Sequence, residues 1–364
     1  REGRVSGDVA STVMLGDNHT SAGQSVHGDL NGDGLSDVAF GLPHAAQVHV
    51  AFGNGTTAVL NGTGMFGHGL AMADFDGDGL DDLLVGAPEE DAANGTLSAW
   101  FSSLGIVAER PADWVMNGQE GEGLGHRLTV ISDLNGDGGH EVAVSSLTDD
   151  TDGKVHVLFG NGTSLDLERS ILPTSIGPAF GQAMASGDLN CDGHADLVVS
   201  NPGTIDSPVG YSAIEIFHGS ATGYNGTPDR TFVSNAQGRL LGSALLVLPD
   251  VTGDGCDDLL ASEPLNGTEA YNAGRLWLWA GSSSGMASTT AWSLDGTSNA
   301  RLGLALTAAG DVDGDGQPDL LVSGAGSGAN PGKLDLYFGN GNGFAADTQT
   351  IVTGSAGEYA AERV

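Results

Sequence analysis

Short apolar runs separated by glycine-rich polar segments recur along the whole chain. Runs such as residues 83–85 and 197–199 are shorter than a helix of ordinary length. Other runs alternate apolar and polar residues with a period of two, as in residues 154–159 and 275–279. Several end at Gly-Asn-Gly turns such as residues 53–55, and Asn-Gly favours tight hairpins. The pattern predicts an all-β protein built from short antiparallel strands.

One acidic block of nine residues occurs six times. Each copy has acids at positions 1, 5 and 9, glycine at position 6, and Asn, Asp or Thr at position 3. The copies begin at Asp29, Asp74, Asp133, Asp188, Asp250 and Asp311. Repeats of this length indicate an array or a propeller. Each repeat is predicted to hold four strands, with the acidic block between the first and the second, which corresponds to one blade of a β-propeller.

The residues that flank the block resemble a known repeat. In the second copy, Phe66-Gly67 precedes the block and Val85-Gly86-Ala87-Pro88 follows it. These residues are similar to the FG-GAP repeat of the integrin alpha-subunit β-propeller and its bacterial relatives. The resemblance covers about residues 21–345, and the motif after the block drifts in the other copies.

The resemblance implies a single β-propeller domain over residues 1–364. Its calcium-loop repeats are expected to begin near residues 21, 65, 121, 178, 238 and 300, with residues 1–20 and 346–364 closing the ring. Integrin-like propellers donate an N-terminal strand to a seventh blade. We therefore expect seven blades, the last one composite or truncated, with strands near residues 11–15 and 357–364. Six blades are the alternative, because only six full calcium-loop repeats are present.

Charge narrows the classes of function. The chain has 47 Asp and Glu residues against 12 Lys and Arg residues, which gives a formal net charge of −35. This balance excludes a nucleic-acid-binding surface, because phosphate contacts need a basic patch. No apolar stretch is long enough to cross a bilayer, so no membrane insertion is expected within this chain. The clustered acids need a counter-ion.

The acidic block has the chemistry of a Ca²⁺ site. Ca²⁺ takes six to eight hard oxygen ligands, and carboxylates at alternate positions of a tight loop with glycine at position 6 are the first half of an EF-hand loop. We expect side-chain ligands at positions 1, 3, 5 and 9, a backbone carbonyl ligand at position 7, and about six ions in total. The predicted ligands of the six blocks are Asp29, Asn31, Asp33, Leu35 and Asp37; Asp74, Asp76, Asp78, Leu80 and Asp82; Asp133, Asn135, Asp137, Gly139 and Glu141; Asp188, Asn190, Asp192, His194 and Asp196; Asp250, Thr252, Asp254, Cys256 and Asp258; and Asp311, Asp313, Asp315, Gln317 and Asp319.

The six sites are not expected to be equal. The second and sixth blocks carry four acids each, whereas the fifth has the neutral Thr252 at position 3. Ligand charge tunes the affinity of such loops. The fifth site is therefore predicted to be the weakest.

No catalytic residue emerges from the sequence, and we expect no enzymatic activity. Residues 281–285 match the nucleophile-elbow pattern GxSxG, with Ser283 in the place of the nucleophile. An elbow needs a strand that leads into a helix, whereas this segment lies at a predicted hairpin turn. The match is therefore interpreted as a coincidence of turn residues.

The two cysteines, Cys191 and Cys256, fall in neighbouring acidic blocks. A disulfide would need their Cα atoms within about 7 Å of each other. The rims of adjacent blades usually lie farther apart than that. We therefore predict free thiols.

The resemblance implies a non-catalytic adhesion or protein-interaction module, extracellular or at the cell surface, with a protein or glycan ligand on the face opposite the calcium loops. The acids expected on that face are Glu89, Glu90, Asp91, Asp149, Asp150, Asp152, Asp206, Glu263 and Glu269. One alternative is a carbohydrate-binding, lectin-like propeller, although the five tryptophans do not recur at one position per repeat. Another is an accessory domain of a secreted enzyme whose catalytic part is absent.

Overall fold

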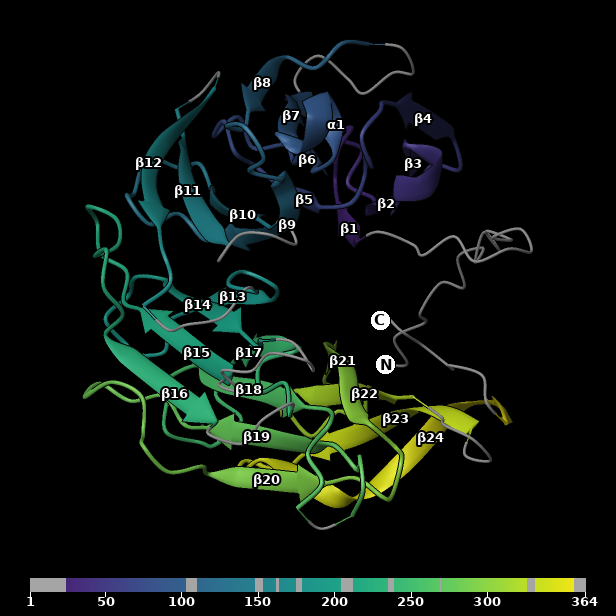
Figure 1. Ribbon diagram of the computed structural model, residues 1–364, viewed down its shortest axis with the longest axis vertical. Coiled ribbons are helices and arrows are strands. Elements are labelled where there is room, and N and C mark those ends of the chain that lie inside the picture. The colour runs from purple at the N-terminus through teal and green to yellow at the C-terminus, as the bar shows by residue number, and fades with distance from the viewer. Residues whose placement is uncertain are drawn as a thin grey trace.

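Six four-stranded antiparallel sheets make up the computed structural model (Figure 1). The structure describes residues 24–102, 110–147, 153–161, 164–174, 179–203, 212–234, 239–268, 270–325 and 331–356. The strands of the first three sheets are β1 (Ser25–Gly28), β2 (Asp37–Leu42), β3 (Gln47–Ala51) and β4 (Thr57–Asn61); β5 (Leu70–Ala73), β6 (Asp82–Ala87), β7 (Thr96–Trp100) and β8 (Trp114–Asn117); and β9 (Leu124–Ile131), β10 (Glu141–Ser146), β11 (Lys154–Gly160) and β12 (Leu165–Ile171). Those of the last three are β13 (Met184–Gly187), β14 (Asp196–Asn201), β15 (Ser212–Phe217) and β16 (Arg230–Ser234); β17 (Leu245–Leu248), β18 (Asp258–Glu263), β19 (Arg275–Trp279) and β20 (Trp292–Asp295); and β21 (Leu302–Gly310), β22 (Asp319–Gly324), β23 (Pro331–Gly339) and β24 (Phe344–Ala356).

Each sheet is one propeller blade. Its strands pair in chain order, and the first strands of successive sheets contact one another from β1 through to β21 around a common centre (Figure 1). The prediction of an all-β propeller with four antiparallel strands per blade is confirmed. Six blades are seen among the described residues, and the count of seven is not confirmed. The strands expected near residues 11–15 and 357–364 lie outside the described residues, and residues 346–356 belong to β24.

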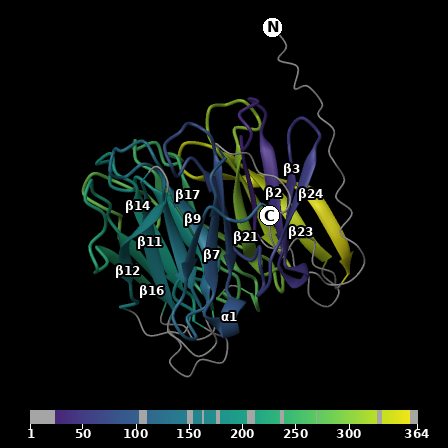
Figure 2. The ribbon, with the colours of Figure 1, turned by 90° about the horizontal axis from the view of Figure 1, so that it is seen from above.

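In the described part of the chain, two short helical segments lie between second and third strands, namely η1 (Pro43–Ala45) and α1 (Glu90–Ala93). In the side view, α1 lies at one rim of the propeller (Figure 2). The acidic blocks connect first to second strands, at the other ends of these strands, and so lie at the opposite rim. Across the described part of the chain, neither helical segment has the length and apolar character needed to cross a bilayer.

The hydrophobic core is divided into layers between neighbouring blades. Val48 and Val50 of β3 pack with Leu83 and Val85 of β6, for example. Second strands such as β6, β10, β14 and β18 are buried at every residue, because blades pack against both of their faces. This packing explains why these strands read as uninterrupted apolar runs.

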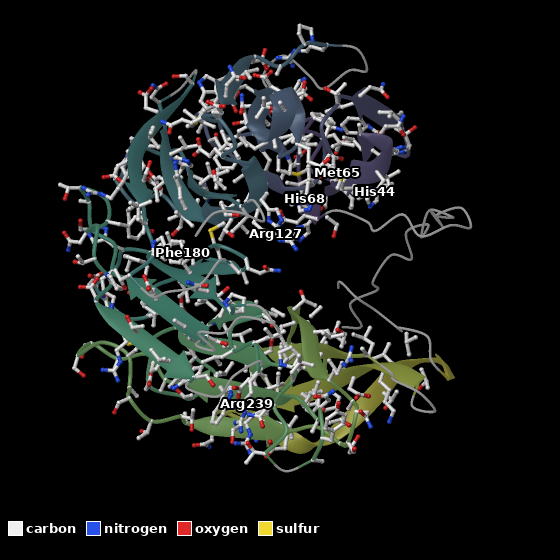
Figure 3. All side chains as sticks on the ribbon, viewed as in Figure 1. His44, Met65, His68, Arg127, Phe180 and Arg239 are labelled. Atoms are coloured by element: carbon white, nitrogen blue, oxygen red, sulfur yellow. A yellow bond between two sulfur atoms is a disulfide. The ribbon has the colours of Figure 1, made fainter. Side chains whose placement is uncertain are left out.

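Glycine permits a close backbone contact between the second and third blades. A Cβ atom on Gly86 would lie 2.0 Å from the carbonyl oxygen of Gly125, and Gly125 itself has a left-handed φ of 95°. The glycine at the equivalent place in the fourth blade, Gly181, also has a positive φ and follows Phe180, which is labelled in Figure 3. In the third blade, Leu124 stands where this motif has phenylalanine. The glycine is thus the more constant part of the motif, because only glycine fits the backbone contact.

Candidate metal centres

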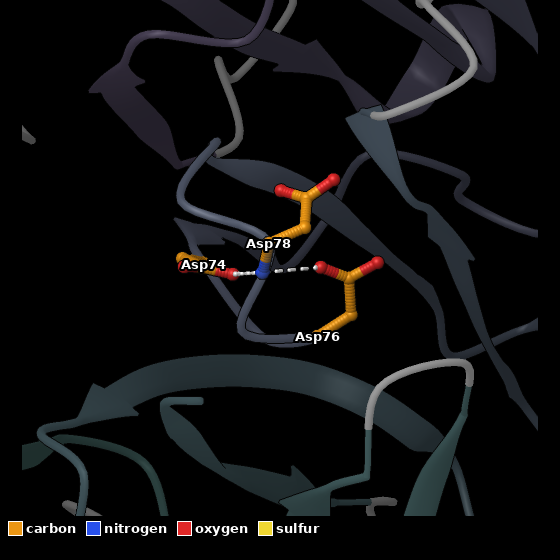
Figure 4. A group of neighbouring side chains, drawn as sticks. All are labelled: Asp74, Asp76 and Asp78. Carbon is orange, nitrogen blue, oxygen red and sulfur yellow. Dashed lines mark hydrogen bonds between the residues drawn. The ribbon is translucent and has the colours of Figure 1, made fainter. Parts of the chain in front are cut away.

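Three carboxylates converge in the second acidic loop. Asp74, Asp76 and Asp78 each offer an oxygen atom, and these oxygens all lie within 4.8 Å of one another (Figure 4). Asp311, Asp313 and Asp315 form the same group in the sixth loop. These are the two loops in which the sequence places four acids. Three hard oxygen donors at such spacing fit a divalent cation such as Ca²⁺.

The acid at position 1 organises the loop. In the second loop, the Asp74 carboxylate accepts the backbone N–H groups of Gly77, Asp78 and Gly79 at 2.7, 3.1 and 2.8 Å. Equivalent bonds from positions 5 and 6 to the position-1 acid occur in all six loops. The carboxylate thus stabilises the turn even without a bound ion.

Glycine at position 6 is required by the backbone. Gly79 has a φ of 89°, and a Cβ atom there would meet nothing within 4 Å. Glycine is therefore needed at this position for the left-handed backbone conformation, and not because a side chain would lack space. Position 4 is left-handed as well and is glycine in five loops, so this glycine is a further sequence signal of the loop.

Positions 3 and 5 also bind backbone. The position-5 carboxylate accepts the N–H of position 7 in every loop, as Asp78 does from Leu80 at 2.9 Å. The position-3 side chain accepts the N–H of position 5 in five loops, as Asp76 does from Asp78 at 3.1 Å. One oxygen of each side chain is held in this way, which fixes its direction. The position-7 residues take part through their N–H groups, and a ligand role for their carbonyls stays a prediction.

The position-9 acid is buried and tied to backbone. Asp82 is fully buried; one of its carboxylate oxygens accepts the N–H of Phe75 at 2.9 Å, and the other accepts the N–H of Ser102, which follows β7, at 2.8 Å. The corresponding acids accept the same pair of bonds in the first, fourth, fifth and sixth blades. This acid therefore joins its loop to the hairpin between the third and fourth strands, a role that was not predicted from the sequence.

Burial affects the ionisation of these acids. Burial, assisted by the charges of Asp76 and Asp74, raises the pKa of Asp82 to about 7 against the opposing effect of its backbone hydrogen bonds. Burial likewise raises the pKa of Glu141 and of Asp196 to about 7. A cation beside such a carboxylate favours its charged form. The acids therefore fit a loop that carries a positive ion.

The fifth loop differs at position 3. The hydroxyl of Thr252 donates to the Asp258 carboxylate at 3.1 Å, and its backbone N–H donates to the same side chain at 2.9 Å. In the other five loops the position-3 oxygen faces the N–H of position 5 instead. Thr252 thus hydrogen-bonds to the buried acid, and the low rank of this site stays a prediction.

Cys191 and Cys256 form a disulfide, with Cα atoms 5.3 Å apart, so the prediction of free thiols was wrong. The reason is that neighbouring acidic loops are hydrogen-bonded to each other. The N–H of Asp188 donates to the Asp257 carboxylate at 2.8 Å, and the N–H of Asp257 donates to the Asp188 carbonyl at 3.1 Å. These bonds bring the two rims closer than the spacing assumed for adjacent blades.

The GxSxG segment lies where a turn was predicted. Residues 281–285 connect β19 to β20, and the Ser282 hydroxyl donates to the Gly285 carbonyl at 2.6 Å. The segment joins two strands and does not lead into a helix. Ser283 thus lacks the strand-to-helix setting of a nucleophile elbow.

Comparison with known proteins agrees with this architecture. Residues 66–100 match the model of the FG-GAP repeat, and residues 133–199 and 250–322 match that of an FG-GAP-like repeat. Integrin alpha-V of Gallus gallus is 29% identical over 211 residues, covering 51% of this chain and 20% of that protein. Integrin alpha-PS2 of Drosophila melanogaster is 31% identical over 204 residues, covering 48% of this chain and 14% of that protein. The chain is an integrin-alpha-like FG-GAP repeat protein.

Each FG-GAP-like match begins at a position-1 acid, Asp133 or Asp250, and ends in the second strand of the next blade. Solved structures share the fold at low identity. The propeller of Dos1 aligns with 92% of this FG-GAP protein and 70% of its own chain, at a TM-score of 0.53 and 14% identity. BBS1N, crystallised with ARL6DN, aligns with 92% of this chain and 85% of its own, at a TM-score of 0.54 and 12% identity. The chain spans no more than a fifth of the length of the integrin relatives.

Proposed function

We propose that this chain is a non-catalytic, calcium-binding interaction module of an extracellular or cell-surface protein, stabilised by about six structural Ca²⁺ ions. The observation that carries the proposal is the shared construction of the loops. A position-1 carboxylate caps the turn and a position-5 carboxylate accepts a backbone N–H in all six, and the Asp or Asn at position 3 accepts one in five. The carboxylates of Asp74, Asp76 and Asp78 would repel one another without a cation. Oxygen donors and glycine turns favour Ca²⁺ among the common ions.

An extracellular location is supported by the disulfide and by the expected affinity. Disulfides persist in oxidising compartments. Ca²⁺ sites in extracellular modules work at about 10⁻⁴–10⁻³ M, which suits loops with few charged ligands.

We place the partner on the face opposite the metal loops. Non-glycine residues with positive φ gather there, and such strained backbone clusters at functional sites. Of ten such residues among those described, nine lie in the connections of that face, namely Ala46, Met65, Asp91, Ala92, Ala93, Leu240, Asn272, Asn299 and Arg301. Glu89, Glu90 and Asp91 lie there too, whereas Glu263 is buried at the end of β18, and Asp149, Asp150, Asp152, Asp206 and Glu269 fall outside the described residues.

The proposal is tested by ion counting and thermal melts. Native mass spectrometry should give about six Ca²⁺ per chain, and chelation should lower the melting temperature. Each site contributes about 2.7 kcal/mol at a hundredfold excess of calcium over its Kd. A melting temperature that is the same with calcium and with chelator would refute the structural role of the ion. Labelled protein should bind cells in a manner lost on Asp91→Lys and kept on Asp166→Lys, a change at an exposed residue of β12.

We also propose that a seventh, composite blade completes the ring, as the resemblance to integrin-like propellers implies. Deletion of residues 1–20 should then lower the melting temperature. A deletion without effect would favour the six-bladed alternative.

A further inference from the structure

A pocket of about 450 Å³ lies between the first and second blades. One wall is formed by the end of β4 and the segment after it, which includes Asn61, Thr63 and Phe66. The other wall is formed by Thr96, Ser98 and Trp100, the alternate residues of β7 that face the first blade. The pocket lies in the size range of small-molecule sites.

The register of the sheets explains why the pocket exists here. Ser98 pairs with Val85, the third residue after the position-9 acid. At the same register position the other third strands carry larger side chains, namely His49, His156, Glu215, Trp277 and Asp335. The second blade therefore has the smallest side chain at this place.

The fifth blade shows how the same space is filled. Arg275 and Trp277 occupy the positions of Thr96 and Ser98, and Glu263 occupies that of Ala87. The indole of Trp277 donates to the Glu263 carboxylate at 3.1 Å, and the Arg275 guanidinium lies 4.8 Å from the Trp277 ring centre. The second blade has Thr96, Ser98 and Ala87 in place of Arg275, Trp277 and Glu263. It therefore lacks two long charged side chains and an indole, which leaves space between it and the first blade.

The walls of the pocket combine an apolar floor with hydroxyl and carboxylate groups. Phe66 and Trp100 are 6% and 5% exposed and lie edge to face, and the Trp100 indole donates to the Arg110 carbonyl at 3.1 Å. Thr63 donates a hydrogen bond to Glu90, so the two walls are joined at one end. The indole is thus held in place as part of a preformed site.

The charges on the walls indicate a neutral ligand. Among the described lining residues, Glu90 is the one carboxylate, too few for a cation site, and the one guanidinium, Arg110, is paired with Asp113. Hydroxyl and carboxylate groups beside an apolar floor suit a molecule with several hydroxyls and an apolar C–H face. We propose that this pocket binds one neutral hexopyranose unit of a glycan, independently of the protein partner proposed above.

The test uses the whole chain with calcium and a panel of methyl glycosides of glucose, galactose and mannose, followed by ligand-observed NMR titration. At least one glycoside should bind in the millimolar range. Ser98→Trp restores the filling seen in the fifth blade and should weaken binding about tenfold or more. Val233→Trp adds the same indole at an exposed site on β16, in the fourth blade and away from the pocket, and should change binding by less than about twofold.

A second variant covers the case in which Ser98→Trp does not fold. Thr96→Val keeps the shape of the side chain and removes its hydroxyl, and should weaken the same glycoside about threefold or more. The proposal is overturned if no glycoside binds, if binding survives both Ser98→Trp and Thr96→Val, or if a parallel panel of acetylated amino-acid amides binds in place of the glycosides.

Discussion

Cys191 and Cys256 connect the fourth and fifth acidic loops covalently, 65 residues apart in sequence and 5.3 Å apart between Cα atoms. Cys191 stands at position 4, with a φ of 58°, where the other five loops have glycine. The crosslink therefore joins two candidate ion sites and holds one of them in a left-handed turn.

Loss of this disulfide should destabilise the propeller. A crosslink that closes a loop of this length contributes about 2–4 kcal/mol. Between two variants without the bond, Cys191→Gly with Cys256→Ser should be more stable than Cys191→Ser with Cys256→Ser by about 1 kcal/mol, because glycine adopts the left-handed turn freely. Urea unfolding in calcium measures both differences. Equal stability of the two double variants would show that strain at position 4 is negligible.

The six loops should lose their ions in a defined order. Asp250→Asn leaves the fifth loop with Asp254 and Asp258 as its acids, whereas Asp74→Asn leaves three acids in the second loop. The Ca²⁺ affinity of such a loop follows the charge of its ligands and the rigidity of the loop. As calcium is removed, the fifth loop should therefore lose its ion first, and the fifth blade should open locally before the other blades. Hydrogen exchange followed during a calcium titration reports the order. Earlier deprotection of the second or sixth loop would mean that local geometry outweighs charge.

The buried acid at position 9 should matter even without an ion. Asp82→Asn replaces one of two accepting oxygens by an NH₂ group, which leaves a buried N–H of Phe75 or Ser102 unpaired. The expected cost is about 1–3 kcal/mol in calcium and in chelator alike. Asp78→Asn is the matched comparison, since Asp78 is exposed and its effect should appear only in calcium. An Asp82→Asn effect confined to calcium would assign Asp82 a ligand role alone.

The backbone contact between the second and third blades should not tolerate a methyl group. Gly86→Ala would place a Cβ atom 2.0 Å from the Gly125 carbonyl oxygen, so we expect a loss of about 3 kcal/mol or more. Gly226→Ala is the control, because a Cβ atom there lies 3.6 Å from the end of the Arg169 side chain, and should change stability by less than about 0.5 kcal/mol. Equal effects of the two substitutions would show that the blades shift apart at little cost.

The four-stranded blades and the acidic loops could be predicted from the sequence. Both recur in tandem, and each copy is formed by residues that are close together in the chain. Asp74, Asp76 and Asp78 converge within one short turn, so their spacing alone indicates their proximity. The bond between Cys191 and Cys256 could not be predicted in this way, because it depends on how two loops from different repeats are hydrogen-bonded.

The hydrogen-bond partners of Asp82 were missed for a similar reason. Ser102 follows twenty residues later and comes close only when β6 and β7 pair. The pocket at Ser98 needs the register of six sheets before the missing side-chain volume can be recognised. The sequence therefore predicts the strands and the acidic loop within each repeat, but it does not predict how residues of different strands and repeats contact one another.

Because the position-9 acid fastens the metal loop to a hairpin in five of the six blades, the metal-side rim of those blades has little freedom to change length. Among the described residues, the connections between second and third strands show no such tie in common, and these connections range in length from four residues at 43–46 to eleven at 264–274. Foreign peptides, such as affinity tags or displayed epitopes, should therefore be accommodated by grafting them after the exposed Gly267 and should disrupt the blade when placed after Asn54.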